Sequence, residues 1–106
     1  VIVRDDLFRN FYEAALRDAE PISASKRIII PEWMAILKYL AGRSKDILDL
    51  LWMLREPGLV NRDRILQLLI GVMGELGGHS VLPGLERYYL EAEIMRAGDE
   101  NGRQER

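Results

Sequence analysis

Cysteine and threonine are both absent from this chain of 106 residues. Without cysteine the chain has no disulfide, no zinc–thiolate site, no iron–sulfur cluster and no cysteine nucleophile. Histidine occurs only once, at His79. Di-iron helical bundles need two Glu-x-x-His motifs, so a single histidine excludes that class as well. The side chains that could still carry a function are carboxylates, arginines and apolar groups.

The chain also lacks an excess of positive charge and a long uninterrupted apolar run. Its net charge of −2 argues against a general affinity for nucleic acid, which needs clustered Lys and Arg. Neither apolar block approaches the roughly 20 residues of a membrane span, so we expect no membrane association. No secretory signal opens the sequence, because charged residues follow Val1–Val3 at once. These absences predict a cytoplasmic protein.

Amides are scarce, and arginine outnumbers lysine by twelve to three. Few thermolabile residues are typical of a thermophilic protein. A GC-rich genome explains the arginine bias equally well, so both interpretations stay open.

The most apolar stretch lies between residues 44 and 78. One apolar block runs from Ile47 to Leu54, and a second runs from Ile65 to Leu76. The segment between them, Arg55–Asn61, contains Pro-Gly and has strong turn chemistry. At about 100° per residue, each block spreads its apolar side chains over a wider arc than a surface helix shows. We therefore expect a compact all-α bundle of about five helices around this central hairpin.

The other helices are marked by breaking and capping residues. The pattern predicts a first helix that Pro21 stops, and a second that begins at Pro31 and ends at Gly42. Ser44 and Asn61 are the expected N-caps of the two helices of the hairpin.

A flexible turn is expected at Gly77–Ser80, with Pro83 opening a last helix. This arrangement predicts a single domain over residues 1–98 and a frayed polar tail over residues 99–106. One alternative concerns two β-branched triplets, Val1–Val3 and Ile28–Ile30, which are suited to pair as a short ladder within or between chains.

Gly71 and Gly74 interrupt the second helix of the hairpin. Each costs about 1 kcal/mol relative to alanine in a helix interior. We expect another backbone to approach closely at these two residues, and a local bend is the alternative interpretation.

No group of residues forms a catalytic, cofactor or metal motif. His79 and Ser80 are adjacent, and neighbours in sequence rarely direct their side chains at each other as a catalytic pair requires. Glu86 and Glu93 share a helix face two turns apart, which is typical of solvated charges as well as of acid–base pairs. The sequence therefore predicts a protein that is not an enzyme, with no cofactor and no metal.

A small helix-turn-helix regulator is an alternative function. Two helices joined by a turn with glycine have the right gross order, and the second opens with basic residues. The candidate DNA contacts are Arg62, Arg64 and Gln67.

The preferred hypothesis is a protein-interaction or assembly subunit, because the apolar helix faces exceed the needs of one small core. A two-fold homodimer is the simplest arrangement. Leu90 and Ile94 lie on the last helix away from its main apolar stripe, and Tyr88 and Tyr89 adjoin them. The alternative interface is the first helix, and isolated exposed residues are a third interpretation. The interface candidates are Tyr88, Tyr89, Leu90 and Ile94 on the last helix, and Phe8 and Tyr12 on the first.

Overall fold

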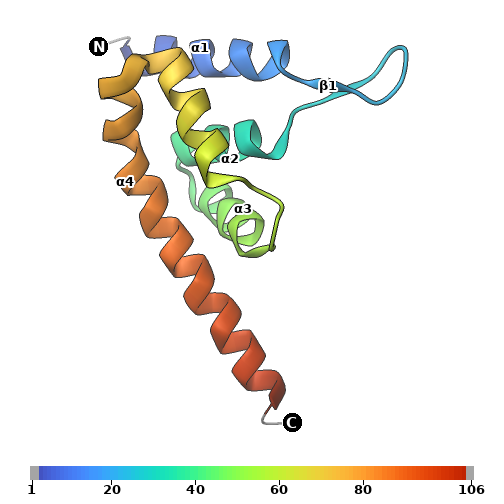
Figure 1. The fold of residues 1–106 in the computed structure, drawn as a ribbon, viewed down its shortest axis with the longest axis vertical. Helices are drawn as coiled ribbons and strands as arrows, with labels where there is room; N and C mark the ends of the chain where they lie inside the picture. Colours follow the sequence, from blue (N-terminus) through green and yellow to red (C-terminus); the bar gives the residue numbers. More distant parts are fainter. Residues whose placement is uncertain (1–2, 105–106) are drawn as a thin grey trace.

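As far as the third helix, the helices of the structure lie close to the residue ranges that the sequence predicts. The computed structural model describes residues 3–104, with side-chain exposure for residues 6–99. Its elements are α1 (Val3–Arg17), β1 (Glu20–Pro21), β2 (Arg27–Ile28), α2 (Pro31–Ala41), α3 (Ser44–Arg55) and α4 (Arg62–Gln104) (Figure 1). The all-α class is confirmed. The described residues form four helices, and the last of them is long and sharply bent at Gly74.

β1 and β2 form a short antiparallel hairpin that projects from the body beyond the end of α1 (Figure 1). Glu20 pairs with Ile28, and residues 20–28 are all exposed. The ladder considered between Val1–Val3 and Ile28–Ile30 is not formed by the residues of it that the structure describes. Ile28 is already paired with β1, and Val3 opens α1. The first two residues lie outside the described part of the chain.

α2 begins and ends at the expected residues. Pro31 is its first residue, where the missing N–H loses no intrahelical hydrogen bond. Gly42 follows its last residue with φ 69°, and its N–H donates to the carbonyl of Lys38 at 3.1 Å. This left-handed conformation favours glycine and closes the helix.

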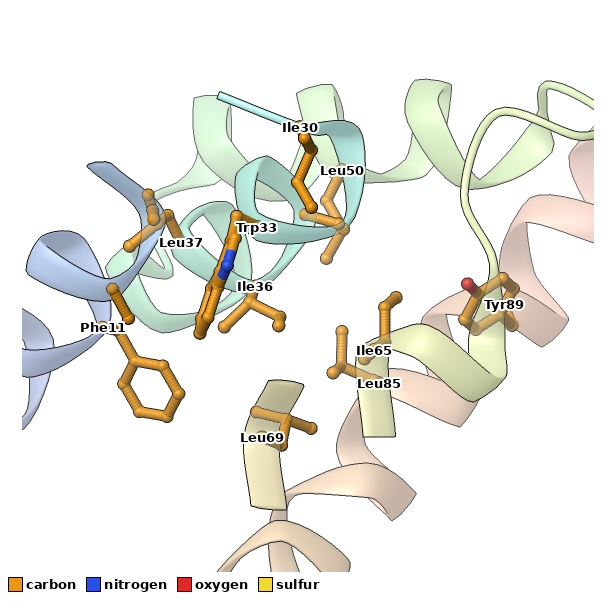
Figure 2. Packing of buried hydrophobic residues seen from close by; sticks show 13 residues of the cluster. Phe11, Ile30, Trp33, Ile36, Leu37, Leu50, Ile65, Leu69, Leu85 and Tyr89 are labelled. Carbon is orange, nitrogen blue, oxygen red and sulfur yellow. The ribbon is translucent and has the colours of Figure 1, made fainter. Parts of the chain in front are cut away.

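α2 lies at the centre of the hydrophobic core, and the hairpin at residues 44–78 does not. The ring of Trp33 meets that of Phe11 on α1 edge-on at 5.9 Å, and both are fully buried. The indole N–H of Trp33 donates to Asp18 at 2.8 Å, which lowers the pKa of that carboxyl. Figure 2 shows side chains of α1 and α2 facing those of α4 across the core. The fully buried large side chains are Phe11, Trp33, Ile36, Leu50, Ile65, Leu69 and Leu85.

α3 was expected to be central, and it is instead an outer helix. Leu50 is fully buried, whereas Leu48 is 51% and Trp52 54% exposed. The wide apolar arc of this helix therefore reaches solvent. The preceding residue, Arg43, occupies the N-cap position that was expected for Ser44, without a side-chain bond to the backbone.

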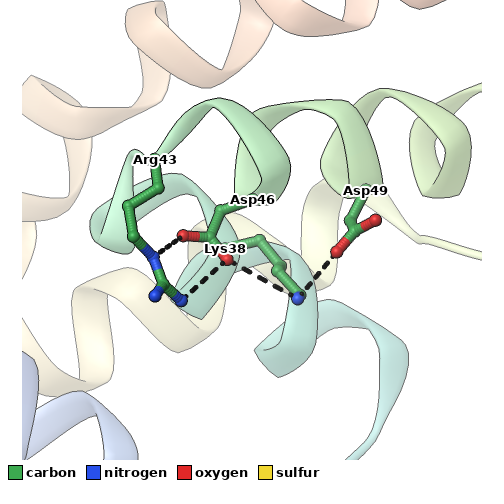
Figure 3. A network of polar contacts seen from close by, with 4 residues as sticks. All are labelled: Lys38, Arg43, Asp46 and Asp49. Atoms are coloured by element: carbon green, nitrogen blue, oxygen red, sulfur yellow. Dashed lines mark hydrogen bonds and ion pairs between the residues drawn. The ribbon is translucent and has the colours of Figure 1, made fainter.

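Ion pairs hold the joint between α2 and α3 (Figure 3). Asp46 is buried, and its carboxylate accepts from the Nε–H of Arg43 at 2.7 Å. The ammonium of Lys38 lies 3.6 Å from Asp46 and 2.9 Å from Asp49. The hydrogen bond that Arg43 donates lowers the pKa of the Asp46 carboxyl. The hydrogen bond that Lys38 donates to Asp49 raises the pKa of Lys38. A buried carboxylate is tolerated here because two cations surround it.

The start of α4 is capped as expected and is also tied to α2. Asn61 accepts a hydrogen bond from the N–H of Arg64 through its side-chain oxygen at 3.1 Å. The backbone N–H of Asn61 donates to the carboxylate of Glu32 at 2.8 Å. Glu32 is buried in the first turn of α2, where the helix dipole favours negative charge.

Gly74 divides α4 into an N-terminal arm (62–73) and a C-terminal arm (75–104). Its backbone angles, φ 80° and ψ 170°, belong to a region that only glycine enters readily. The turn expected at Gly77–Ser80 and the helix start at Pro83 are both wrong, because these residues are helical. Pro83 stays inside the helix and loses one backbone hydrogen bond. The helix also runs past residue 98 to Gln104.

Close packing occurs at other glycines than the two expected. A methyl group placed at Gly71 or Gly74 would meet no atom within 4 Å, so nothing in the described chain packs against them. At Gly78 the same group would lie 2.8 Å from the Ile70 side chain and 2.9 Å from the Ile70 backbone nitrogen. At Gly84 it would collide with the phenol of Tyr39. The two arms of α4 therefore meet at Gly78.

Candidate protein-interaction surface

The C-terminal arm of α4 has one face against the body and one face free. Leu85 and Ala92 are fully buried on the inner face. At about 100° per residue, Leu76, Leu90 and Ile94 lie within about 40° of one another on the opposite face. In Figure 1 this arm forms one edge of the molecule, with the other elements on one side of it only.

Leu76, Leu90 and Ile94 are named here the outer stripe. Their exposed fractions are 90%, 59% and 64%. At 1.5 Å per residue, Leu76 and Ile94 are about 27 Å apart along the axis. Between them the same face carries exposed polar residues and a proline: His79, Ser80, Pro83 and Arg87. The outer stripe is thus a long apolar row with polar interruptions, as interfaces between subunits commonly are.

Arg62 holds the C-terminal arm against the N-terminal arm. Its guanidinium lies 3.2 Å from Glu86 and 3.1 Å from Glu93. The same group stacks over the ring of Tyr89, 3.9 Å from the ring centre. Farther along the arm, Arg55 of α3 pairs with Asp99. These contacts join the arm to the rest of the molecule at two levels along its length.

Tyr89 is a buried residue of the inner face. The side chain is 6% exposed, and its hydroxyl has no hydrogen-bond partner among the described residues. Burial raises the pKa of Tyr89 to about 12, against the opposing effect of the Arg62 charge. The place of Tyr89 is in the core, so it contributes no area to the outer stripe.

The other interface candidates are divided between surface and core. Leu90 and Ile94 are well exposed, whereas Tyr88 is half-buried with its ring edge against Tyr39 at 5.9 Å. On α1, Tyr12 is 45% exposed and Phe8 is partly buried against the core. Of the six candidates, Leu90 and Ile94 alone lie together on an unpartnered face.

The three candidate DNA contacts do not form one free basic surface. Arg62 is engaged by the carboxylates of Glu86 and Glu93 and by the Tyr89 ring. Arg64 and Gln67 are exposed near the start of α4. The glutamates considered as an acid–base pair therefore act as the partners of a structural arginine.

Sequence reasoning missed Leu76 and the outer face of α3. Leu76 was assigned to the core face of a helix assumed to end nearby, and the bend at Gly74 turns it outward. On α3, Leu48 and Trp52 form a second exposed apolar pair, and the guanidinium of Arg55 lies 4.4 Å from the Trp52 ring centre. Their one-turn spacing was visible, but their exposure depends on which neighbours cover the helix.

Two other kinds of site were sought in the described residues. No group of three or more His, Asp or Glu side chains in that part of the chain is arranged to hold a metal ion. The segment Arg62–Asp99 is long and apolar enough to cross a membrane by length and composition alone. Gly74 breaks the helix inside this segment, and Arg62, Glu86 and Glu93 join its two arms through charges.

No family model, no curated protein and no solved structure matches this chain.

Proposed function

We propose that this chain is a non-catalytic assembly subunit that binds a second copy of itself through the outer stripe. The supporting observation is that three large apolar side chains, Leu76, Leu90 and Ile94, share one exposed face of a helix. Leaving such side chains in water forgoes about 1.5–3 kcal/mol for each one that an interface would fully bury. Two-fold pairing is the commonest way to cover a face of this kind.

The charges beside the outer stripe are self-complementary in an antiparallel pair. Arg87 and Glu91 are both exposed, and neither forms an ion pair within the described residues. A two-fold axis near residue 89 places Arg87 opposite Glu91 of the partner subunit, and the reciprocal pair forms with it. Leu90 and Ile94 lie near this axis, and Leu76 lies about 20 Å from it along the helix. A parallel pair would instead align like charges. The charge pattern therefore favours a second copy in antiparallel orientation as the occupant of this face.

The test is the oligomeric state of the double variant Leu90→Glu with Ile94→Glu, measured by light scattering coupled to size exclusion. We expect a dimeric wild type and a monomeric variant with an unchanged far-ultraviolet circular dichroism spectrum. The matched control is Leu48→Glu with Trp52→Glu, which places two glutamates one turn apart on the exposed face of α3. The control should remain dimeric.

A wild type that stays monomeric at high concentration would contradict self-association. A double variant that stays dimeric would move the interface elsewhere, and Phe8 and Tyr12 on α1 are then the next residues to change.

The helix-turn-helix alternative has less support, because Arg62 is occupied by two carboxylates and a ring. DNA binding through this region would weaken with salt and would be lost on Arg62→Ala with Arg64→Ala. Absence of retention on a DNA column at low salt would remove this alternative.

A further inference from the structure

Gly74 is the one residue with non-helical backbone angles inside α4. Its conformation, φ 80° and ψ 170°, turns the C-terminal arm back onto the body. A methyl group placed at Gly74 meets no atom within 4 Å, so no side chain packs on the hinge residue itself, and the close contact between the two arms lies at Gly78 against Ile70. The bend rests on backbone torsion at a single glycine, together with the contacts that the returning arm makes.

If Gly74 took helical angles, α4 would be one continuous helix of 43 residues. Such a helix is about 65 Å long at 1.5 Å per residue. The whole molecule, with the arm folded back, measures 48 Å along its longest axis. A straightened arm would therefore extend beyond its own body. The side chains of its inner face, Leu85, Tyr89 and Ala92, would then be exposed to solvent. Only a second copy of the chain has the surface that matches that face.

We propose that Gly74 is the hinge of an arm exchange, in which the C-terminal arm of one copy seats on the body of a second copy. This inference rests on the proposed association of two copies of the chain, but the exchange has its two-fold axis near Gly74 and does not need contact between Leu90 and Ile94 of the two copies. The contacts between arm and body are the same in the exchanged and unexchanged forms, so the equilibrium between them depends chiefly on the hinge. Leu76, which is 90% exposed, lies two residues from this hinge.

Charge reversal separates the two forms, because Arg62 lies on the body side of the hinge and Glu86 and Glu93 lie on the arm. One variant is Arg62→Glu, and the other is Glu86→Arg with Glu93→Arg. Each variant alone sets like charges against each other, whether or not its arm is exchanged. In an exchanged heterodimer, both clusters regain opposite charges. Within an unexchanged chain, mixing restores nothing.

The measurement is the melting temperature of each variant and of their equimolar mixture after unfolding and refolding together. Each variant alone should melt below the wild type, and the mixture should regain most of the loss as a single transition. For a domain of this size, a loss of about 4 °C or more is large enough to resolve. A mixture that melts as the superposition of its two components would overturn the exchange.

The second measurement changes the hinge itself. Gly74→Ala disfavours the bend, because its backbone region is strained for any residue with a side chain, and should raise the association constant about tenfold or more. The matched control is Gly71→Ala, one turn earlier and equally free of neighbours, which favours helix in both forms and should leave association unchanged. Equal association of the two variants would refute the hinge even if the charge-reversed variants fail to fold.

The two proposals fail in different ways. If the outer stripe is not the interface but the arms exchange, Leu90→Glu with Ile94→Glu stays dimeric and the charge-reversed mixture is still restored. If the outer stripe is the interface and no exchange occurs, that double variant becomes monomeric and mixing restores nothing.

Discussion

The ring of Tyr89 packs in the core, whereas its hydroxyl forms no hydrogen bond with any described residue. The ring lies in the core under the guanidinium of Arg62, and the side chain is 6% exposed. The hydroxyl is buried without a hydrogen-bond partner in the described part of the chain. Replacing Tyr89 by phenylalanine keeps the ring, its packing and its contact with Arg62, and removes the unsatisfied group alone.

The expected effect of Tyr89→Phe has two parts. At neutral pH the variant should be more stable, because an unsatisfied buried polar group costs about 1–3 kcal/mol. At alkaline pH the difference should grow. Burial raises the pKa of Tyr89 from 10.0 to about 12, so the folded state keeps a proton that the unfolded state releases. The stability that comes from this neutral hydroxyl is fully present below pH 10.0 and is lost as pH rises toward 12.

The size of the alkaline loss follows from the shift. A shift of two pKa units corresponds to about 3 kcal/mol between the ends of this window. Phenylalanine has no proton to release, so the variant does not lose this stability. At neutral pH the variant should melt above the wild type by about 4–8 °C for each kcal/mol of added stability. This difference in melting temperature should widen above pH 10.0.

The assay is thermal unfolding followed by circular dichroism, from neutral pH to the upper end of that window. The control is Tyr12→Phe, because the Tyr12 side chain is 45% exposed and its hydroxyl reaches water. The control should match the wild type at every pH. A Tyr89→Phe variant that is less stable than the wild type at neutral pH would refute the reasoning, because it would mean that the hydroxyl has a partner. A gap that does not widen with pH would refute the burial argument for the pKa.

Two further predictions concern the core and the joint between α2 and α3. Leu85→Ala should lower the free energy of unfolding by about 2–5 kcal/mol, because it opens a cavity at a fully buried site. Leu76→Ala changes a side chain that is 90% exposed and should alter the free energy of unfolding of the monomer by less than about 0.5 kcal/mol. Denaturant titration of the two variants in parallel measures this difference, and similar losses would contradict the inner and outer faces assigned to the arm. Asp46 has its carboxyl pKa lowered by Arg43, so the stability it supplies is present above its unfolded pKa and lost as pH falls through its folded pKa. Asp46→Asn should therefore reduce the acid dependence of the melting temperature, and an unchanged acid dependence would show that the ion pairs with Arg43 and Lys38 do not contribute.

The boundaries of α2 and the cap of α4 could be predicted because they depend on neighbouring residues only. Pro31 suits the first turn of a helix, and Gly42 suits the left-handed residue after its end. Asn61 satisfies an N–H within its own turn. These effects act over a few residues, so their sequence signals were sufficient. The exposure of Leu90 and Ile94 also followed from their angular position on one helix.

A local bend at Gly71 or Gly74 was the alternative interpretation of these glycines, and the bend occurs at Gly74. Its exact place and size could not be predicted, because several residues compete for it. Gly71, Gly74, Gly77, Gly78 and Pro83 all disfavour a continuous helix. The break occurs where bending brings the two arms together at Gly78, so the choice depends on contacts that exist only after folding. The same contacts decide which glycines allow close approach.

The sequence predicted which segments are helical, but it did not predict which face of each helix is buried. The apolar periodicity by itself predicted helices over α3, over residues 62–76 and over residues 83–98, since period and capping are properties of the local chain; the helical turn that joins the last two was not predicted. Which arc of each helix is covered was decided by the tertiary structure. Trp33 became central and Trp52 exposed, although both lie in strongly apolar helices. Tyr89 and Leu90 are adjacent in sequence, and the direction of one bend places the first under Arg62 and the second in solvent. An apolar pattern specifies which faces can be buried, and only the packing of distant elements determines which of them are.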